Sequence, residues 1–236
     1  MVHDDFLNIQ FSKSNLDRYY IRMSILKALR GNFQLFEGNL LDIGCGKMPY
    51  KDFILKNSSV KNYIGLDIEN GFQYSVIVKP DYTWDGIKMP FANGTFETTF
   101  ATEVLEHCPY PKVVLDETYR VMKQGGCFFF TVPFLWNLHE VPNDEYRFTP
   151  FALERLLKES GFKNIDIKAT GGWHASMAQM LGLWVRRAPM SIRQRNFLSW
   201  ILKPVIKKLI KMDKFSPVEF KEGQMITGLS GVAFKE

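Results

Sequence analysis

The chain has 236 residues, of which 46% are hydrophobic and 23% are charged. This composition can bury the core of one large α/β domain and excludes a disordered chain. The longest apolar run, around 197–202, is far shorter than the roughly 20 residues that span a bilayer, so we expect no transmembrane helix.

The formal net charge of +5 is unevenly distributed. Residues 186–214 hold nine Lys or Arg and one acid, Asp213, a net of +8, so the rest of the chain carries −3. Three cysteines and an N-terminus that begins with Asp4 and Asp5, unlike a secretory leader, predict a reducing, cytoplasmic setting.

Short apolar runs alternate with helical periodicities along most of the chain. An N-terminal helical segment, 1–38, carries a helix over 15–29 that ends before Gly31. Strands are then predicted at 40–43, 63–66, 98–102, 127–132, 164–169 and 227–234, and helices at 50–55, 111–122 and 150–160. Alternation of strand and helix predicts a parallel sheet with right-handed crossovers.

About fifty residues, 172–222, separate the last two predicted strands, far more than a usual connection. We predict a helical insertion there. Within it, apolar residues recur at helical spacing against lysines over 197–214, and Pro204 should kink this helix or begin a second one. Either its apolar face packs on the sheet domain and its lysines face water, or the helix docks on an anionic lipid surface.

The turn Asp42-Ile43-Gly44-Cys45-Gly46 follows a buried strand, and its glycines let a ligand approach the backbone closely. Asp67 ends the next strand, 25 residues after Asp42, where a carboxylate can accept hydrogen bonds from both hydroxyls of a ribose. The third glycine of the nicotinamide-binding fingerprint is replaced by Pro49, which disfavours a pyrophosphate cradle.

Three further motifs follow in order: Trp84-Asp85-Gly86 with Met89-Pro90-Phe91, then Glu103-Val104-Leu105-Glu106-His107, then Tyr119-Arg120-Val121-Met122-Lys123-Gln124-Gly125-Gly126. With the two described above, they make residues 40–162 resemble the class I S-adenosylmethionine-dependent methyltransferases, specifically the type-11 family. The resemblance implies one methyltransferase domain over 1–236. Its expected fold is a Rossmann-like three-layer sandwich with a mostly parallel seven-stranded sheet, the last strand antiparallel, and a helical insertion before that strand.

The resemblance also implies the cofactor, S-adenosylmethionine, and the residues around it. Gly44 and Gly46 should pass near its methionine moiety, Asp67 should hold the ribose, and Asp85 should accept from the adenine amino group, although an Asp at this position can also cap a turn. The full set expected to bind the cofactor is Asp42, Gly44, Cys45, Gly46, Asp67, Ile68, Trp84, Asp85, Gly86, Glu103 and His107.

Methyl transfer needs no covalent nucleophile, but a hydroxyl acceptor needs a base. His107, just after the fourth predicted strand, is our first candidate and His139, in the loop after the fifth, is the second. His174 could cover the acceptor, and His3 lies at the N-terminus. We expect no metal, because neither Cys-x-x-Cys nor His-Glu-x-x-His spacing occurs.

The form Gly-Cys-Gly-x-x-Pro-Tyr resembles a subset of the family associated with surface polysaccharide biosynthesis, so we expect a small-molecule or glycan acceptor and a cytoplasmic enzyme, peripheral at the inner face of the membrane if 197–214 meets lipid. Two alternatives stay open. A nucleic-acid methyltransferase would explain the basic charge, but no Asn-Pro-Pro-Tyr-like motif follows the fourth strand. A non-catalytic cofactor-binding module would keep the fold without the reaction.

Overall fold

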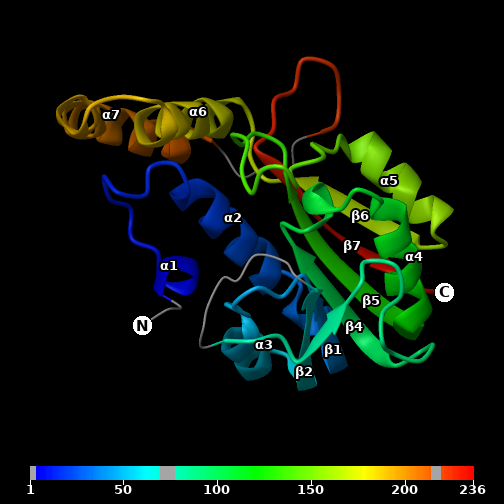
Figure 1. Ribbon diagram of the computed structural model, residues 1–236. Helices are drawn as coiled ribbons and strands as arrows, with labels where there is room; N and C mark the ends of the chain where they lie inside the picture. The colour runs from blue at the N-terminus through cyan, green and yellow to red at the C-terminus, as the bar shows by residue number, and fades with distance from the viewer. Residues whose placement is uncertain (1–3, 70–77, 214–218) are drawn as a thin grey trace.

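The computed structural model describes residues 4–69, 78–213 and 219–236 (Figure 1). In these residues seven strands form one sheet in the order β3-β2-β1-β4-β5-β7-β6. All neighbours pair in parallel except β7, which is antiparallel to both β5 and β6. The strands are β1 (Glu37–Ile43), β2 (Ser59–Ile68), β3 (Tyr82–Trp84), β4 (Phe96–Thr102), β5 (Met122–Pro133), β6 (Lys163–Ala169) and β7 (Gly228–Phe234). The predicted fold class is confirmed.

Helices cover both faces of this sheet (Figure 1). They are α1 (Asp4–Leu7), α2 (Tyr19–Arg30), α3 (Lys51–Asn57), α4 (Pro111–Val121), α5 (Pro150–Glu159), α6 (Trp173–Arg187) and α7 (Ile192–Met212), with the short 3₁₀ turns η1 (Phe33–Leu35) and η2 (Leu105–His107). Strand β5 shows why two layers form: Phe128 and Phe130 join the core under α4 and α5, whereas Phe129 joins the core under α2 and α3. The part of β5 from Cys127 to Phe130 is buried on both faces and is therefore apolar at every position.

Local sequence signals set several element boundaries. Helix α5 begins where predicted, because the Thr149 hydroxyl accepts from the Ala152 amide at 3.3 Å and Pro150 fits the first turn. Helix α7 begins at Ile192, earlier than predicted, because Ser191 and Gln194 form a reciprocal capping box.

Two sequence predictions need correction, and one of the two alternatives given for Pro204 is excluded. Strand β3 was not located, because three residues at the sheet edge carry too little periodicity to detect. Residues 15–18 form a turn before α2, held by amides of Arg18 and Tyr19 on the Asn15 carbonyl. Pro204 does not start a second helix, since α7 continues through it. The last residue of the predicted 197–214 helix, Lys214, lies outside the described residues.

Helices α6 and α7 lie side by side beyond one end of the sheet (Figure 1). Their shared core contains Leu16 of the N-terminal segment with Ala178, Val185 and Ile206. The interpretation that the apolar face of α7 packs on the sheet domain is therefore wrong, because α6 and the N-terminal segment cover it. At the end of α7, Asp213 accepts from the Ala175 amide and the Tyr20 hydroxyl, both at 3.1 Å, and so ties α7 to α6 and α2.

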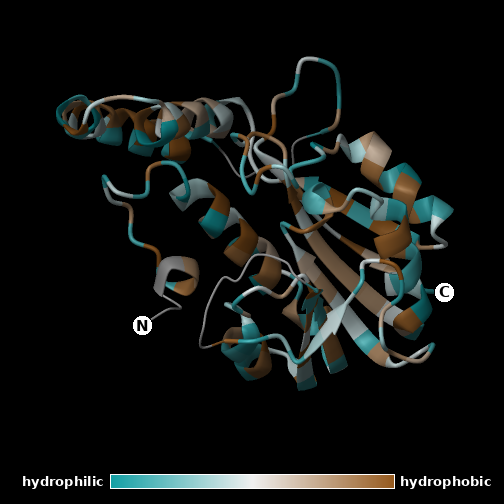
Figure 2. Cartoon of the chain, viewed as in Figure 1, coloured by the Kyte–Doolittle hydropathy of each residue, from teal (hydrophilic) through white to brown (hydrophobic). Residues whose placement is uncertain are grey.

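Each of these two helices also exposes apolar side chains at helical spacing. Figure 2 shows brown, hydrophobic segments along both helices. The exposed side chains are Trp173, Met177, Met180 and Trp184 on α6, and Ile192, Phe197, Trp200, Ile201, Val205 and Met212 on α7. Among the described helices, however, none is both long and apolar enough to cross a bilayer.

Candidate functional site

The glycine turn at the carboxyl end of β1 has the conformation that its sequence requires. Gly44 and Gly46 have φ of +65° and +51°, a region that L side chains rarely adopt. A Cβ on Gly44 would lie 2.6 Å from Cγ2 of Val104, so the turn approaches the end of β4 too closely for any other residue.

Asp67, at the end of β2, fastens this turn. Its Oδ2 accepts a hydrogen bond from the Gly46 amide at 2.8 Å, and its Oδ1 accepts one from the Ile68 amide at 2.8 Å. Burial raises the pKa of Asp67, while these two amide hydrogen bonds oppose the rise. The Asp67 carboxylate therefore fixes the glycine turn to the end of β2.

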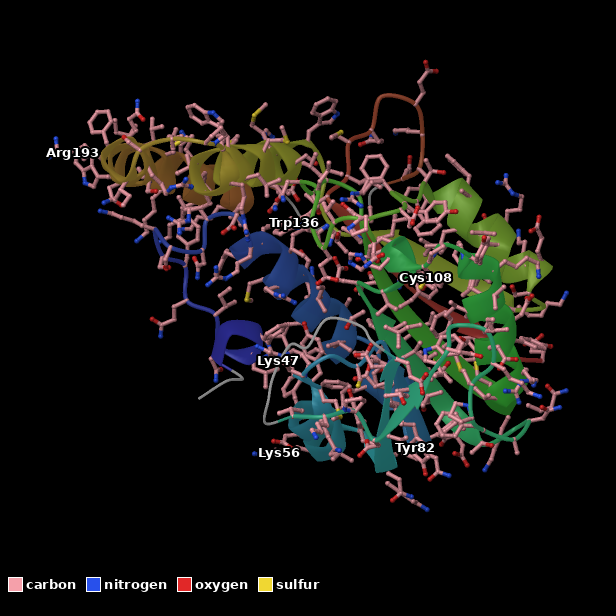
Figure 3. The ribbon with its side chains drawn as sticks, viewed as in Figure 1. Lys47, Lys56, Tyr82, Cys108, Trp136 and Arg193 are labelled. Carbon is pink, nitrogen blue, oxygen red and sulfur yellow. The ribbon has the colours of Figure 1, made fainter. Side chains whose placement is uncertain are left out.

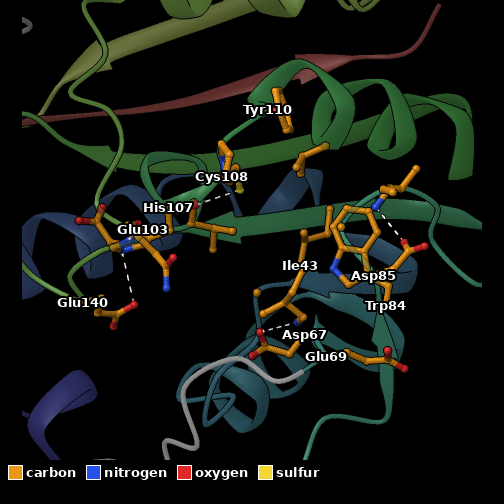
Figure 4. A pocket seen from close by; sticks show the side chains of 18 residues that line it. Ile43, Asp67, Glu69, Trp84, Asp85, Glu103, His107, Cys108, Tyr110 and Glu140 are labelled. Atoms are coloured by element: carbon orange, nitrogen blue, oxygen red, sulfur yellow. Dashed lines mark hydrogen bonds and ion pairs between the residues drawn. The ribbon is translucent and has the colours of Figure 1, made fainter.

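A cavity of about 550 Å³ opens beside this corner (Figure 4). Asp67, Trp84 and Asp85 stand at one side of it, and Glu103 and His107 at the other. Of the residues expected to bind the cofactor, those that line this cavity are Gly44, Asp67, Ile68, Trp84, Asp85, Gly86, Glu103 and His107.

A second cavity of about 330 Å³ adjoins the first and shares Gly44, Glu103, His107 and Glu140 with it. Cys45 and Gly46, expected near the cofactor, line this cavity instead, together with His139. Sequence reasoning missed its remaining polar wall, which comes from the N-terminal segment, the glycine turn, the loop after β5 and α6: Arg18, Arg22, Lys47, Trp136 and Arg187. No motif marks these residues, because they meet only when α2 and α6 fold against the sheet.

Asp42 lies outside both cavities. It is 3% exposed, and its Oδ2 accepts a hydrogen bond from the Tyr63 hydroxyl at 2.6 Å. Burial raises the pKa of Asp42 to about 8. Asp42 thus supports the turn from below, where it does not face a ligand.

Asp85 caps a turn at the border of the first cavity. Its Oδ1 accepts from the amides of Ile87 and Lys88 at 2.8 and 3.0 Å, which closes a turn, and the residue also borders the first cavity. These amide hydrogen bonds lower the pKa of Asp85, so its carboxylate stays ionised at the cavity mouth.

The two candidate bases meet where the cavities join. The rings of His107 and His139 lie 4.6 Å apart, centroid to centroid, at 68°. His107 Nδ1 lies 2.8 Å from the Asn143 carbonyl oxygen, and His139 Nδ1 lies 3.2 Å from Asp144 Oδ2. Burial lowers the pKa of His139, which favours a neutral ring able to accept a proton.

The loop after β5 that carries His139 is anchored at two points. The amides of Glu145 and Tyr146 both donate to the Glu106 carbonyl, at 2.9 and 3.0 Å. Arg147 donates two hydrogen bonds to Asp144, at 2.7 and 2.9 Å, and thereby lowers the pKa of that carboxyl.

The remaining candidates stand apart from the cavities. His174 is exposed at the start of α6 and lines neither cavity, and His3 lies outside the described residues. Cys127 is buried in the sheet, and burial raises the pKa of its thiol to about 12.

Comparison with known proteins agrees with this geometry. Residues 41–130 match the type-11 family, described as a methyltransferase domain. Residues 41–130 are therefore similar to the methyltransferase domains of this family. The matched residues run from the glycine turn to the middle of β5, so they include Asp67, Asp85 and His107.

Among curated proteins, the chain is 33% identical over 98 residues to cycloartenol-C-24-methyltransferase 1 of Oryza sativa, which covers 38% of this chain and 28% of that protein. The chain thus spans about a third of the length of the sterol methyltransferases it matches.

Two solved structures share the fold over nearly the whole chain. A methyltransferase from Archaeoglobus fulgidus, described as dependent on S-adenosylmethionine, has a TM-score of 0.56 at 16% identity and covers 99% of this chain and 98% of its own. Phosphoethanolamine N-methyltransferase 2 of Haemonchus contortus, solved with S-adenosylmethionine, has a TM-score of 0.56 at 14% identity and covers 100% of this chain and 60% of its own. Because the sequence identities are so low, this similarity establishes the shared fold alone.

Proposed function

We propose that this chain transfers a methyl group from S-adenosylmethionine to a small molecule or glycan. The observation that carries the proposal is the contact between the two cavities: a cofactor in the larger one and an acceptor in the smaller one would meet at Gly44, Glu103, His107 and Glu140. The larger cavity, at about 550 Å³, lies within the range of small-molecule sites.

The residues around the larger cavity suit the cofactor. Gly44 leaves room for a ligand against the backbone, Asp67 offers a carboxylate to the ribose, and Asp85 offers one to the adenine amino group. When bound, the cofactor supplies a sulfonium methyl group that an acceptor atom displaces in line, a reaction accelerated mainly by positioning. Cys45 and Gly46 would border the acceptor side of this arrangement.

For a hydroxyl acceptor, His139 or His107 would take the proton. Both rings border the smaller cavity, and each has its Nδ1 facing an oxygen acceptor, which leaves Nε2 as the basic atom. Asp144 holds His139 in this tautomer, and Arg147 holds Asp144 ionised.

The smaller cavity favours an acceptor that carries an acidic group. Four cationic side chains line it against two carboxylates, Glu103 and Glu140: Arg18, Arg22, Lys47 and Arg187. A glycan bearing a phosphate or carboxylate meets this requirement, as does an acidic small molecule. The rice relative is named for a small-molecule acceptor, a sterol.

We test this function by native mass spectrometry of the purified chain, followed by incubation with S-adenosylmethionine labelled in its methyl group and fractionated cell extract. Binding of one cofactor and transfer of label into acidic small molecules or glycans supports the proposal. Label in RNA would favour the nucleic-acid alternative, and binding without any transfer would favour the non-catalytic module.

We also propose that α6 and α7 bind an anionic membrane surface. Both helices expose the apolar side chains described above. Helix α7 is also strongly basic, and its Lys207, Lys208 and Lys211 are all exposed. Aromatic and aliphatic side chains insert at the lipid interface, while each nearby lysine adds about 1 kcal/mol toward anionic lipid. A membrane site would bring the enzyme to lipid-linked acceptors.

Liposome co-sedimentation at low salt tests the membrane proposal. Lys207→Glu/Lys208→Glu/Lys211→Glu should reduce binding to anionic vesicles on the order of 100-fold, from about 1 kcal/mol per lysine. The matched control is Lys56→Glu/Lys61→Glu/Lys79→Glu, whose Lys56 lies far from Arg193 of α7 (Figure 3). Equal binding of the wild type and the α7 variant to neutral and anionic vesicles would refute the proposal.

A further inference from the structure

Glu106 is a buried carboxylate that accepts no side-chain or backbone hydrogen bond from the described residues. The residue is 0% exposed, and among the described residues neither of its carboxylate oxygens has a hydrogen-bond partner. Buried ionised groups are costly unless they are paired or coordinate a metal. Nothing in the proposed methyl transfer uses this side chain, so its burial at the carboxyl edge of β4 requires another explanation.

Two histidines complete the surroundings of this carboxylate. One ligand atom from each of Glu106, His107 and His139 lies within 4.8 Å of the others. His107 Nε2 is 3.7 Å from Glu106 Oε1 and also 3.7 Å from Glu140 Oε2. Bonds to a common ion are about 2.0–2.2 Å long, so modest side-chain rotations suffice to bring these atoms around one centre.

The hydrogen bonds behind the two rings fix the tautomer that a metal requires. His107 Nδ1 faces the Asn143 carbonyl, which can only accept, so this nitrogen carries the proton and Nε2 keeps its lone pair. His139 Nδ1 faces the Asp144 carboxylate in the same way. A carbonyl or carboxylate behind the far nitrogen of a histidine is the usual support of a metal ligand.

From this geometry we propose that Glu106, His107 and His139 bind a divalent transition-metal ion at the junction of the two cavities. Two imidazoles and a carboxylate suit Mn²⁺, Fe²⁺, Co²⁺ or Zn²⁺ better than Mg²⁺ or Ca²⁺, which prefer sites made of oxygen alone. Glu140 is placed to add a second carboxylate. The motif spacings in the sequence pointed away from a metal because His139 comes from a separate loop.

The open positions of such an ion would face the smaller cavity, which both histidines line. While their Nε2 atoms bind the ion, the two histidines cannot act as the base. An acceptor hydroxyl bound to the ion would instead release its proton to water more readily, because a metal lowers the pKa of a coordinated oxygen acid. This consequence rests on the proposed methyl transfer, whereas the binding site itself does not.

Metal binding is measured on the whole chain after treatment with a chelator, by calorimetry with ZnCl₂ and by electron paramagnetic resonance with MnCl₂, in the absence of cofactor. We expect one ion per chain in the wild type. Glu106→Gln keeps the shape of the side chain and should weaken binding at least tenfold. Asp144→Asn, which alters the support of His139 and the ion pair with Arg147 but no proposed ligand, should weaken it 10- to 100-fold.

His174→Ala is the matched control, because it removes an exposed histidine outside both cavities and should leave metal affinity unchanged. Thermal unfolding supplies a second readout: added Mn²⁺ should raise the Tm of the wild type and not that of Glu106→Gln. Failure of the wild type to bind an ion, or binding that is equal in the wild type and Glu106→Gln, would overturn the site.

A separate assay addresses the chemistry. Chelator-treated wild type should regain methylation when Mn²⁺ is returned, and Glu106→Gln should not. If the wild type binds the ion yet methylates equally well without it, the catalytic role is refuted while the site stands. If no methyl acceptor is found, the metal-binding measurements alone still decide whether the site exists.

Discussion

Replacing Asp67 with alanine tests the proposal that this carboxylate and the glycine turn bind the cofactor. In the structure its two carboxylate oxygens hold the amides of Gly46 and Ile68, each at 2.8 Å, and the residue borders the larger cavity. Alanine removes the acceptor for a ribose hydroxyl and releases the glycine turn at the same time. The variant should therefore fold but bind S-adenosylmethionine weakly.

The size of the effect follows from the interactions lost. A hydrogen bond to a charged group contributes about 1.5–3 kcal/mol, which corresponds to about 10- to 150-fold in the dissociation constant. Asp67→Asn keeps one oxygen as an acceptor and should lose less. The order of affinity is therefore expected to be wild type, Asp67→Asn, Asp67→Ala.

Isothermal titration calorimetry with S-adenosylmethionine measures these affinities, and circular dichroism establishes that each variant is folded. Asp116→Ala serves as the control, because Asp116 is an exposed acid on α4 that pairs with Lys112 and lines neither cavity. An affinity of folded Asp67→Ala within twofold of the wild type would remove Asp67 from the cofactor site.

Four further substitutions have defined outcomes. Gly44→Val places a branched Cβ against Val104 at a φ of +65°, so denaturant unfolding should show a loss of about 1–3 kcal/mol together with lost cofactor binding, and a stable variant that binds would contradict this. His107→Ala and His139→Ala should each lower turnover about 10²–10⁴-fold with little change in cofactor affinity, and full activity in both would exclude a histidine base. Asp42, whose pKa is raised to about 8, keeps a proton that the unfolded chain releases, so its stabilising contribution is complete below about pH 4 and is lost as the pH rises through 8. Asp42→Asn should remove up to about 1.4 kcal/mol per pH unit from the pH dependence of unfolding in this window, and an unchanged slope measured with urea at pH 5 and 7.5 would refute the assignment.

The sheet could be predicted because its signals are local. A run such as Phe128 to Phe130 is apolar whatever surrounds it, and Thr149 with Pro150 marks a helix start within three residues. Strand β3 lacked such a signal, since its three residues owe their conformation to pairing with β2.

Most of the residues named from the sequence as cofactor ligands do line one cavity, because they follow strands whose carboxyl ends meet at one edge. Asp42 is the instructive exception. It stands in the same motif as Gly44, but strand alternation turns its side chain toward Tyr63 and away from the cavity. A motif therefore indicates the turn without indicating which of its side chains face the ligand.

The acceptor side could not be predicted, because its wall is assembled from distant segments. Arg22 lies on α2 and Arg187 ends α6, and each is an ordinary surface cation in the sequence. They come together because Leu16 of the N-terminal segment packs against the α6–α7 pair, and because Asp213 ties both helices to Tyr20. Long-range packing of this kind leaves no periodic trace.

The turn after β4 links the two sides of the site. Glu103 adopts a φ of +55°, a conformation that costs on the order of 1 kcal/mol for a residue with a side chain, and Thr131 holds it by a hydroxyl hydrogen bond to Oε1 at 2.8 Å. This conformation leaves Glu103 bordering both cavities, while three residues later the Glu106 carbonyl anchors the loop that carries His139. One strained turn therefore sets both the inner wall of the cofactor cavity and the position of the second histidine. Relaxing it, for example with Thr131→Val, should displace both at once, so cofactor affinity and turnover should fall together, in contrast to the selective loss of turnover expected for His139→Ala.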